Sequence, residues 1–63
     1  MTWATYREIK GLFIEDAMER LECSKGFARG VWETEEEAFL ESLAEQFWDS
    51  YNQLVYDVLS QYI

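Results

Sequence analysis

Apolar side chains recur along the first third of the chain at the spacing of an amphipathic helix. They are Trp3, Tyr6, Ile9, Phe13, Ala17 and Leu21. At about 100° per residue these positions form one stripe, and acidic residues gather on the opposite side. Thr2 and Thr5 are equally suitable N-caps, and Lys25 followed by Gly26 is a typical C-terminal stop. The pattern predicts a helix over residues 3–25.

A broader apolar pattern runs through the second half of the chain. Leu40, Ala44, Phe47, Tyr51, Leu54 and Val58 follow one another in alternating steps of four and three, which is heptad spacing. Further apolar residues widen the stripe on both sides. Thr34-Glu35-Glu36-Glu37 has the form of a capping box, and no Pro or Gly follows it. The pattern predicts one long helix over residues 34–62.

Gly26 and Gly30 bracket the segment between these helices, and we expect residues 26–33 to form a loop. Its apolar residues are Phe27, Val31 and Trp32. They are too apolar for a loop exposed to water, so they form either a hydrophobic lid over the end of the helices or a tip that binds a partner. The candidate partner-binding residues of this tip are Phe27, Arg29 and Trp32.

Two helices joined by one loop make an all-α, antiparallel helical hairpin, with residues 1–63 as a single domain. A chain of 63 residues buries only about 60% of its unfolded surface. Its second helix offers more apolar surface than the shorter first helix can cover, so we expect a homodimer with a four-helix arrangement. The predicted dimer interface consists of Leu43, Phe47, Trp48, Tyr51, Leu54, Val55, Val58, Leu59 and Tyr62.

The charge of the chain is strongly negative, with 13 acidic and 5 basic residues and a net charge of −8. All the basic residues lie before Gly30, and this balance argues against direct binding to nucleic acid. Glu37, Glu41, Glu45 and Asp49 form a row at i, i+4 spacing. The row is either a solvated face, a carboxylate ladder that imitates the phosphates of DNA, or a docking surface for metal ions or a basic partner.

The sequence offers little that could carry chemistry. It has no His, its serines have no recognisable base partner, and no glycine-rich phosphate loop is present. With Cys23 as the one thiol, a structural zinc site is not expected. No signal peptide or membrane span is visible. We therefore expect a cytoplasmic protein that is not an enzyme and has no cofactor, metal or membrane partner.

In its length, its acidic charge and its predicted two-helix layout, the whole chain resembles the small acidic early-region proteins of lambdoid bacteriophages. The resemblance implies an early regulator that binds a host bacterial protein and affects host takeover or the lytic–lysogenic choice. It implies no particular functional residues. The residues themselves leave three hypotheses: an interaction protein, an acidic DNA mimic that inhibits a DNA-binding protein, and a structural subunit of a larger assembly.

Overall fold

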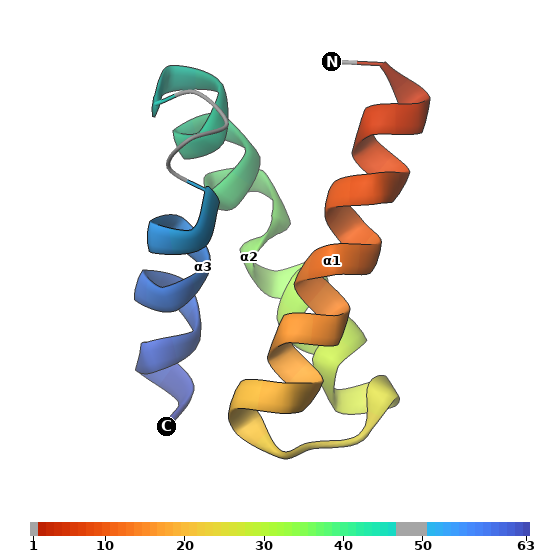
Figure 1. The fold of residues 1–63 in the computed structure, drawn as a ribbon, viewed down its shortest axis with the longest axis vertical. Coiled ribbons are helices and arrows are strands. Elements are labelled where there is room, and N and C mark those ends of the chain that lie inside the picture. Colours follow the sequence, from red (N-terminus) through yellow and green to blue (C-terminus); the bar gives the residue numbers. More distant parts are fainter. Residues whose placement is uncertain (1, 47–50) are drawn as a thin grey trace.

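The computed structural model describes residues 2–46 and 51–63 and is all-α over these ranges (Figure 1). Helix α1 spans Trp3–Leu21, α2 spans Lys25–Gln46 and α3 spans Tyr51–Leu59, followed by the 3₁₀ turn η2 at Ser60–Tyr62. Helices α1 and α3 run in one direction and α2 runs in the other. The all-α prediction is confirmed, but the described residues form three helices rather than a two-helix hairpin.

Helix α1 begins where its cap was expected and ends earlier. The Thr2 hydroxyl accepts a hydrogen bond from the backbone N–H of Thr5 at 3.2 Å, so Thr2 is the N-cap. The helix ends at Leu21, because Glu22 takes up a left-handed conformation with φ of 50°. The N–H of Glu22 then donates to the carbonyl of Met18, as at many helix C-termini. The predicted end at residue 25 is therefore wrong.

The predicted loop over residues 26–33 is also wrong, because this segment is the first part of α2. The Ser24 hydroxyl accepts the backbone N–H of Phe27 at 3.2 Å and caps the helix. Nothing lies within 4 Å of a Cβ built on Gly30, and no glycine has a positive φ. These glycines lower helix propensity without breaking the helix. The Thr34 hydroxyl bonds to the Gly30 carbonyl at 3.0 Å, so Thr34 lies within the helix and does not cap it.

The predicted long helix over residues 34–62 is wrong as well, because α2 ends at Gln46 and a separate helix α3 begins at Tyr51. Helix α3 packs against both α1 and α2. The ring of Tyr51 meets Phe39 of α2 edge-to-face, with centroids 5.9 Å apart, and its hydroxyl donates to Asp16 of α1 at 3.2 Å. The apolar residues of α3 therefore pack into the interior of their own chain.

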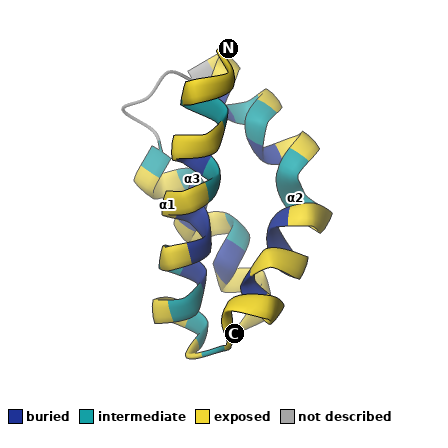
Figure 2. Ribbon diagram, turned by 90° about the vertical axis from the view of Figure 1, so that its right-hand side faces the viewer, coloured by how far each residue is buried: buried dark blue, intermediate teal, exposed yellow. Residues whose placement is uncertain are grey.

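The core lies where the three helices face one another (Figure 2). Its largest fully buried side chains are Trp32, Phe13, Phe39, Ile9, Leu59 and Val55. Phe13 and Phe39 both lie against Trp32, with ring centroids 5.0 Å and 6.0 Å from its own. Edge-to-face and tilted contacts of this kind add to the stabilisation from burial. The aromatic residues therefore join α1 to α2 at the centre of the molecule.

Candidate functional site

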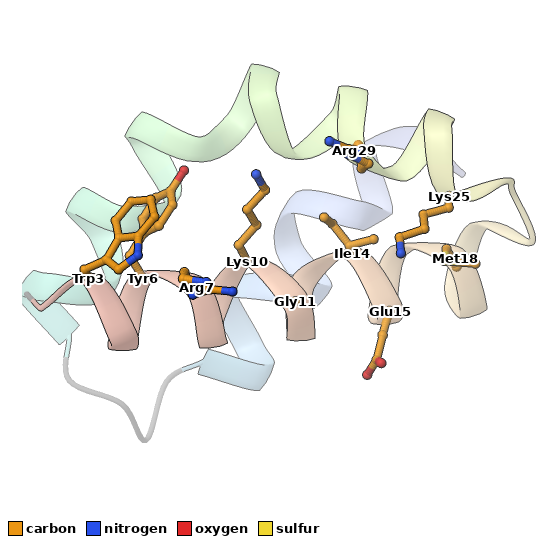
Figure 3. Close-up of a pocket in the computed structure, with 10 residues that line it drawn as sticks. All are labelled: Trp3, Tyr6, Arg7, Lys10, Gly11, Ile14, Glu15, Met18, Lys25 and Arg29. Atoms are coloured by element: carbon orange, nitrogen blue, oxygen red, sulfur yellow. The ribbon is translucent and has the colours of Figure 1, made fainter.

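A groove of about 620 Å³ lies between α1 and α2 on the surface of the molecule (Figure 3). We call it the cationic groove. Its lining residues are Trp3, Tyr6, Arg7, Lys10, Gly11, Ile14, Glu15 and Met18 from α1, and Lys25 and Arg29 from α2. The antiparallel packing of the two helices creates the groove, because it places the second half of α1 beside the first turns of α2.

Four of the chain's five basic residues line the cationic groove: Arg7, Lys10, Lys25 and Arg29. Lys10 extends from α1 toward α2, and Lys25 extends from α2 toward α1. None of the four forms an ion pair with another residue in the described part of the chain. Glu15, which also lines the groove, points away from α2. The groove therefore concentrates positive charge on a protein with a net charge of −8.

An aromatic platform closes one end of the groove. The rings of Trp3 and Tyr6 are stacked, with centroids 5.5 Å apart and planes at 17°, and Trp3 is 71% exposed. Tyr6 in turn meets the buried Trp32 edge-on at 6.1 Å. The Tyr6 hydroxyl donates a hydrogen bond to Glu36 of α2, which raises the pKa of Tyr6 above its usual value. The platform is thus fixed to both helices while the face of Trp3 stays open.

The indole N–H of Trp32 lies beneath this platform and is fully buried. Glu36 raises the pKa of Tyr6, whereas this N–H lowers it, and the effect of Glu36 is the larger. Nevertheless, the indole N–H meets hydrogen-bond geometry with no described residue. A buried indole N–H without a partner is destabilising, so its place is set by the packing of the ring.

The acidic residues of α2 occupy a different surface. Glu37, Glu41 and Glu45 are exposed, and we call these three residues the acidic row. Asp49, which was expected to continue the row, lies outside the described residues. Leu40 and Ala44 line a shallow hollow beside the row. No described residue forms an ion pair with the row, so its carboxylates face solvent.

The structure separates the residues that were expected to form a binding tip. Trp32 is completely buried in the core, so the prediction that it contacts a partner is wrong. Ala28 lies four residues before Trp32 and Phe39 seven residues after it, so all three share the buried face of α2 once the segment is helical. Phe27 is 54% exposed beside a small hollow that also includes Tyr62. Arg29 lies in the cationic groove.

Most of the described residues of the predicted dimer interface pack in or against the core of their own chain. Leu43, Val55 and Leu59 are buried in the core, and Tyr51, Leu54 and Val58 pack against it. Tyr62 is 37% exposed, and its hydroxyl donates to Glu35 at 2.8 Å. Phe47 and Trp48 lie outside the described residues. Most of the described residues of the predicted interface therefore pack within their own chain, and the homodimer stays a prediction.

Within the described residues, no three His, Cys, Asp or Glu side chains are grouped so that they could hold a metal ion. The Cys23 thiol is partly buried and donates to the carbonyl of Ala17 at 3.6 Å. None of the described helices combines the length and the apolar character that crossing a membrane requires. The cationic groove offers four positive charges and one exposed ring, which suit non-covalent binding.

Sequence reasoning missed the cationic groove, although it noted that the basic residues lie early in the chain. Lys10 and Lys25 are far apart in sequence, and only the packing of α1 against α2 brings them together. The spacing of Tyr6, Lys10 and Ile14 at i, i+4 could have indicated a mixed aromatic and cationic strip on one helix. Comparisons with protein families, curated proteins and solved structures found no match to this chain.

Proposed function

We propose that this protein is a non-catalytic interaction protein that binds a positively charged surface of another protein through the acidic row of α2. The observation that carries the proposal is the placement of exposed, unpaired carboxylates where they weaken their own helix. Glu45 lies in the last turn of α2, at the negative end of the helix dipole, and no basic residue is present in that turn.

The destabilisation has two sources. A carboxylate near a helix C-terminus costs about 0.3–1 kcal/mol, because the unpaired carbonyls there carry negative partial charge. The neighbouring carboxylates of the acidic row also repel one another by a few tenths of a kcal/mol per pair. Residues that weaken the fold without packing against anything are typical of functional surfaces. A basic partner would relieve both effects on binding.

The resemblance to early proteins of lambdoid phages makes a bacterial host protein the first partner to test. In that setting the interaction would serve host takeover or the choice between lysis and lysogeny, in the host cytoplasm. The burial of Trp32 supports the acidic row over the expected apolar tip as the contact surface.

A DNA mimic is the second candidate function, and the geometry of the row favours it. Residues at i, i+4 in a helix rise by about 6 Å per step, so the carboxylates form a regular ladder. A protein surface that receives DNA phosphates could accept such a ladder. The two candidates differ in one respect: a mimic competes with DNA for its partner.

Self-association stays a prediction, and its interface would have to use surfaces other than the buried face of α3. Exposed apolar residues that could contribute are Trp3, Leu12, Phe27, Tyr56, Tyr62 and Ile63. The proposed function does not require a dimer, since the acidic row lies on a single helix of one chain.

The test starts from capture of host proteins on the immobilised chain, followed by binding measurements with the purified partner. Glu41→Gln with Glu45→Gln should weaken binding by about tenfold or more, since charged contacts contribute several kcal/mol when paired. Glu8→Gln with Glu19→Gln is the matched control, because it removes the same charge from exposed positions of α1. Equal weakening by both pairs would contradict the proposal, and competition by duplex DNA would identify the mimic.

A further inference from the structure

The cationic groove is a second charged surface, and the acidic row does not account for it. We propose that the groove binds an acidic segment of a partner protein. In this proposal the carboxylates of the segment lie against Lys10, Lys25 and Arg29, and an apolar side chain of the segment rests on the open face of Trp3.

The charge of the groove favours an anionic ligand. Lys25 stands in the first turn of α2, at the positive end of the helix dipole, and no acidic residue is present in that turn. A cation in this position is destabilising, in the same way that a carboxylate at the other end of the helix is destabilising. Four cations without carboxylate partners among the described residues repel one another across the groove. An anionic ligand would remove both penalties.

The surrounding charge restricts what can reach the groove. The net charge of the whole chain is −8, and the four groove cations contribute +4 to it. The rest of the chain therefore carries −8 − 4 = −12. At physiological ionic strength charges are screened over about 8 Å, so the groove attracts anions that fit closely rather than at long range. This favours a short acidic segment over an extended polyanion.

The groove also has an apolar part. Ile14 and Met18 line it, and Trp3 remains 71% exposed although its other face is stacked on Tyr6. Trp and Arg side chains are enriched at binding hot spots. The ring would select a ligand that carries an apolar or planar group next to its negative charges.

The groove suits a protein segment better than single-stranded nucleic acid, which also binds through stacking and cations. At the Trp3 end the groove meets Glu36, which accepts the hydrogen bond from Tyr6, and Glu33 is close enough to act on the pKa of the same tyrosine. A nucleic acid carries a negative charge at every phosphate, so its phosphates would be repelled by these carboxylates. A protein segment can have neutral or basic residues there.

The experiment uses a labelled synthetic peptide of repeated Glu-Glu-Leu triplets and the full chain. We expect it to bind at least about tenfold more tightly than the same peptide with Gln in place of Glu. Binding should weaken as salt is raised. Trp3→Ala should weaken the Glu-Glu-Leu peptide more than a peptide of Glu alone, because only the former has an apolar side chain for the ring.

Arg20 provides the matched control for the groove cations. It is the one basic residue outside the groove, and its guanidinium lies 5.9 Å from the ring centre of Tyr56. Arg29→Gln should weaken peptide binding several-fold, whereas Arg20→Gln, with the same change in net charge, should leave it within about twofold. Circular dichroism of each variant reports whether the helices are retained.

Several results would overturn the proposal. These are equal binding of the Glu and Gln peptides, equal effects of Arg29→Gln and Arg20→Gln, or tighter binding of oligothymidylate of the same length. Self-association of the chain that Arg29→Gln abolishes would show that the groove takes the acidic row of a second copy instead. The outcome is independent of the proposed function, because the peptide assay does not involve Glu41 or Glu45.

Discussion

The cationic groove and the acidic row share helix α2 but depend on the fold in different ways. The groove takes its cations from two helices, and its aromatic platform lies against the buried Trp32. The acidic row requires only that α2 is helical, since residues at i, i+4 share a face in any helix. One surface is therefore a property of tertiary packing and the other of secondary structure, and they can be disrupted separately.

Loss of Trp32 should have the largest effect. Trp32→Ala removes a fully buried ring that contacts Tyr6, Phe13 and Phe39. Such truncations lower the free energy of unfolding by about 3–5 kcal/mol, which for a chain this short approaches its whole stability. Urea denaturation followed by circular dichroism measures the loss, and binding in the groove should disappear with it.

Phe27→Ala is the control for that substitution, because Phe27 lies in the same segment but is 54% exposed. It should change the free energy of unfolding by about 1 kcal/mol or less. If the two substitutions cost the same, residues 25–32 would not be packed as an amphipathic helix.

Reversal of charge in the acidic row should stabilise the protein. Glu41→Lys with Glu45→Lys places cations near the C-terminus of α2, where the helix dipole favours them. It also replaces the repulsion between Glu37 and Glu41 by an attraction between Glu37 and the new lysine at position 41. The free energy of unfolding should rise by about 1 kcal/mol. The Gln pair at the same positions should give a smaller increase, and thermal unfolding measures the series. A decrease would mean that the carboxylates have stabilising partners.

Gly30→Ala tests the helical assignment of the segment that sequence patterns predict as a loop. Gly30 does not have a positive φ, and a Cβ there would meet nothing within 4 Å. Alanine should therefore stabilise the protein by about 0.5–1 kcal/mol through lower backbone entropy of the unfolded chain. Destabilisation, measured by the midpoint of urea unfolding, would indicate a loop at this position.

Lys25→Glu separates stability from binding in the groove. It places a carboxylate in the first turn of α2, where the dipole favours it, and should raise the free energy of unfolding by about 0.3–1 kcal/mol. The same substitution should abolish binding of the acidic peptide. If stability and peptide affinity instead fell together, the lysine would have a structural role.

The smallest effect is confined to alkaline pH. Burial, and then the charge of Asp16, raises the pKa of Tyr51 above its usual range. In the unfolded chain this phenol loses its proton near pH 10, whereas in the folded chain it remains protonated. Stability from this group is therefore present below about pH 10 and declines as the pH rises further. The slope of unfolding free energy against pH should be shallower in Tyr51→Phe, and an unchanged slope would contradict this assignment.

The sequence predicts the start and the buried face of α1 because its apolar stripe and its cap at Thr2 agree, but it places the end of the helix too late. It fails at α2 because Gly26 and Gly30 suggest a break, whereas Ser24 caps a helix that continues through both glycines. It fails again after Gln46 because a continuous heptad pattern fits one long helix and also two helices that share a core.

The sequence by itself determined that the chain is helical, that its second half is acidic, and that Glu37, Glu41 and Glu45 share one face. These properties depend on residues within one turn of each other, and helix geometry relates them directly. Only the tertiary structure decided that Trp32 is in the core, that the apolar residues of α3 pack against α1 and α2, and that Lys10 and Lys25 line one groove. Each of these depends on which helix faces which. That choice is made by burial of apolar area over the whole chain, which no local pattern contains.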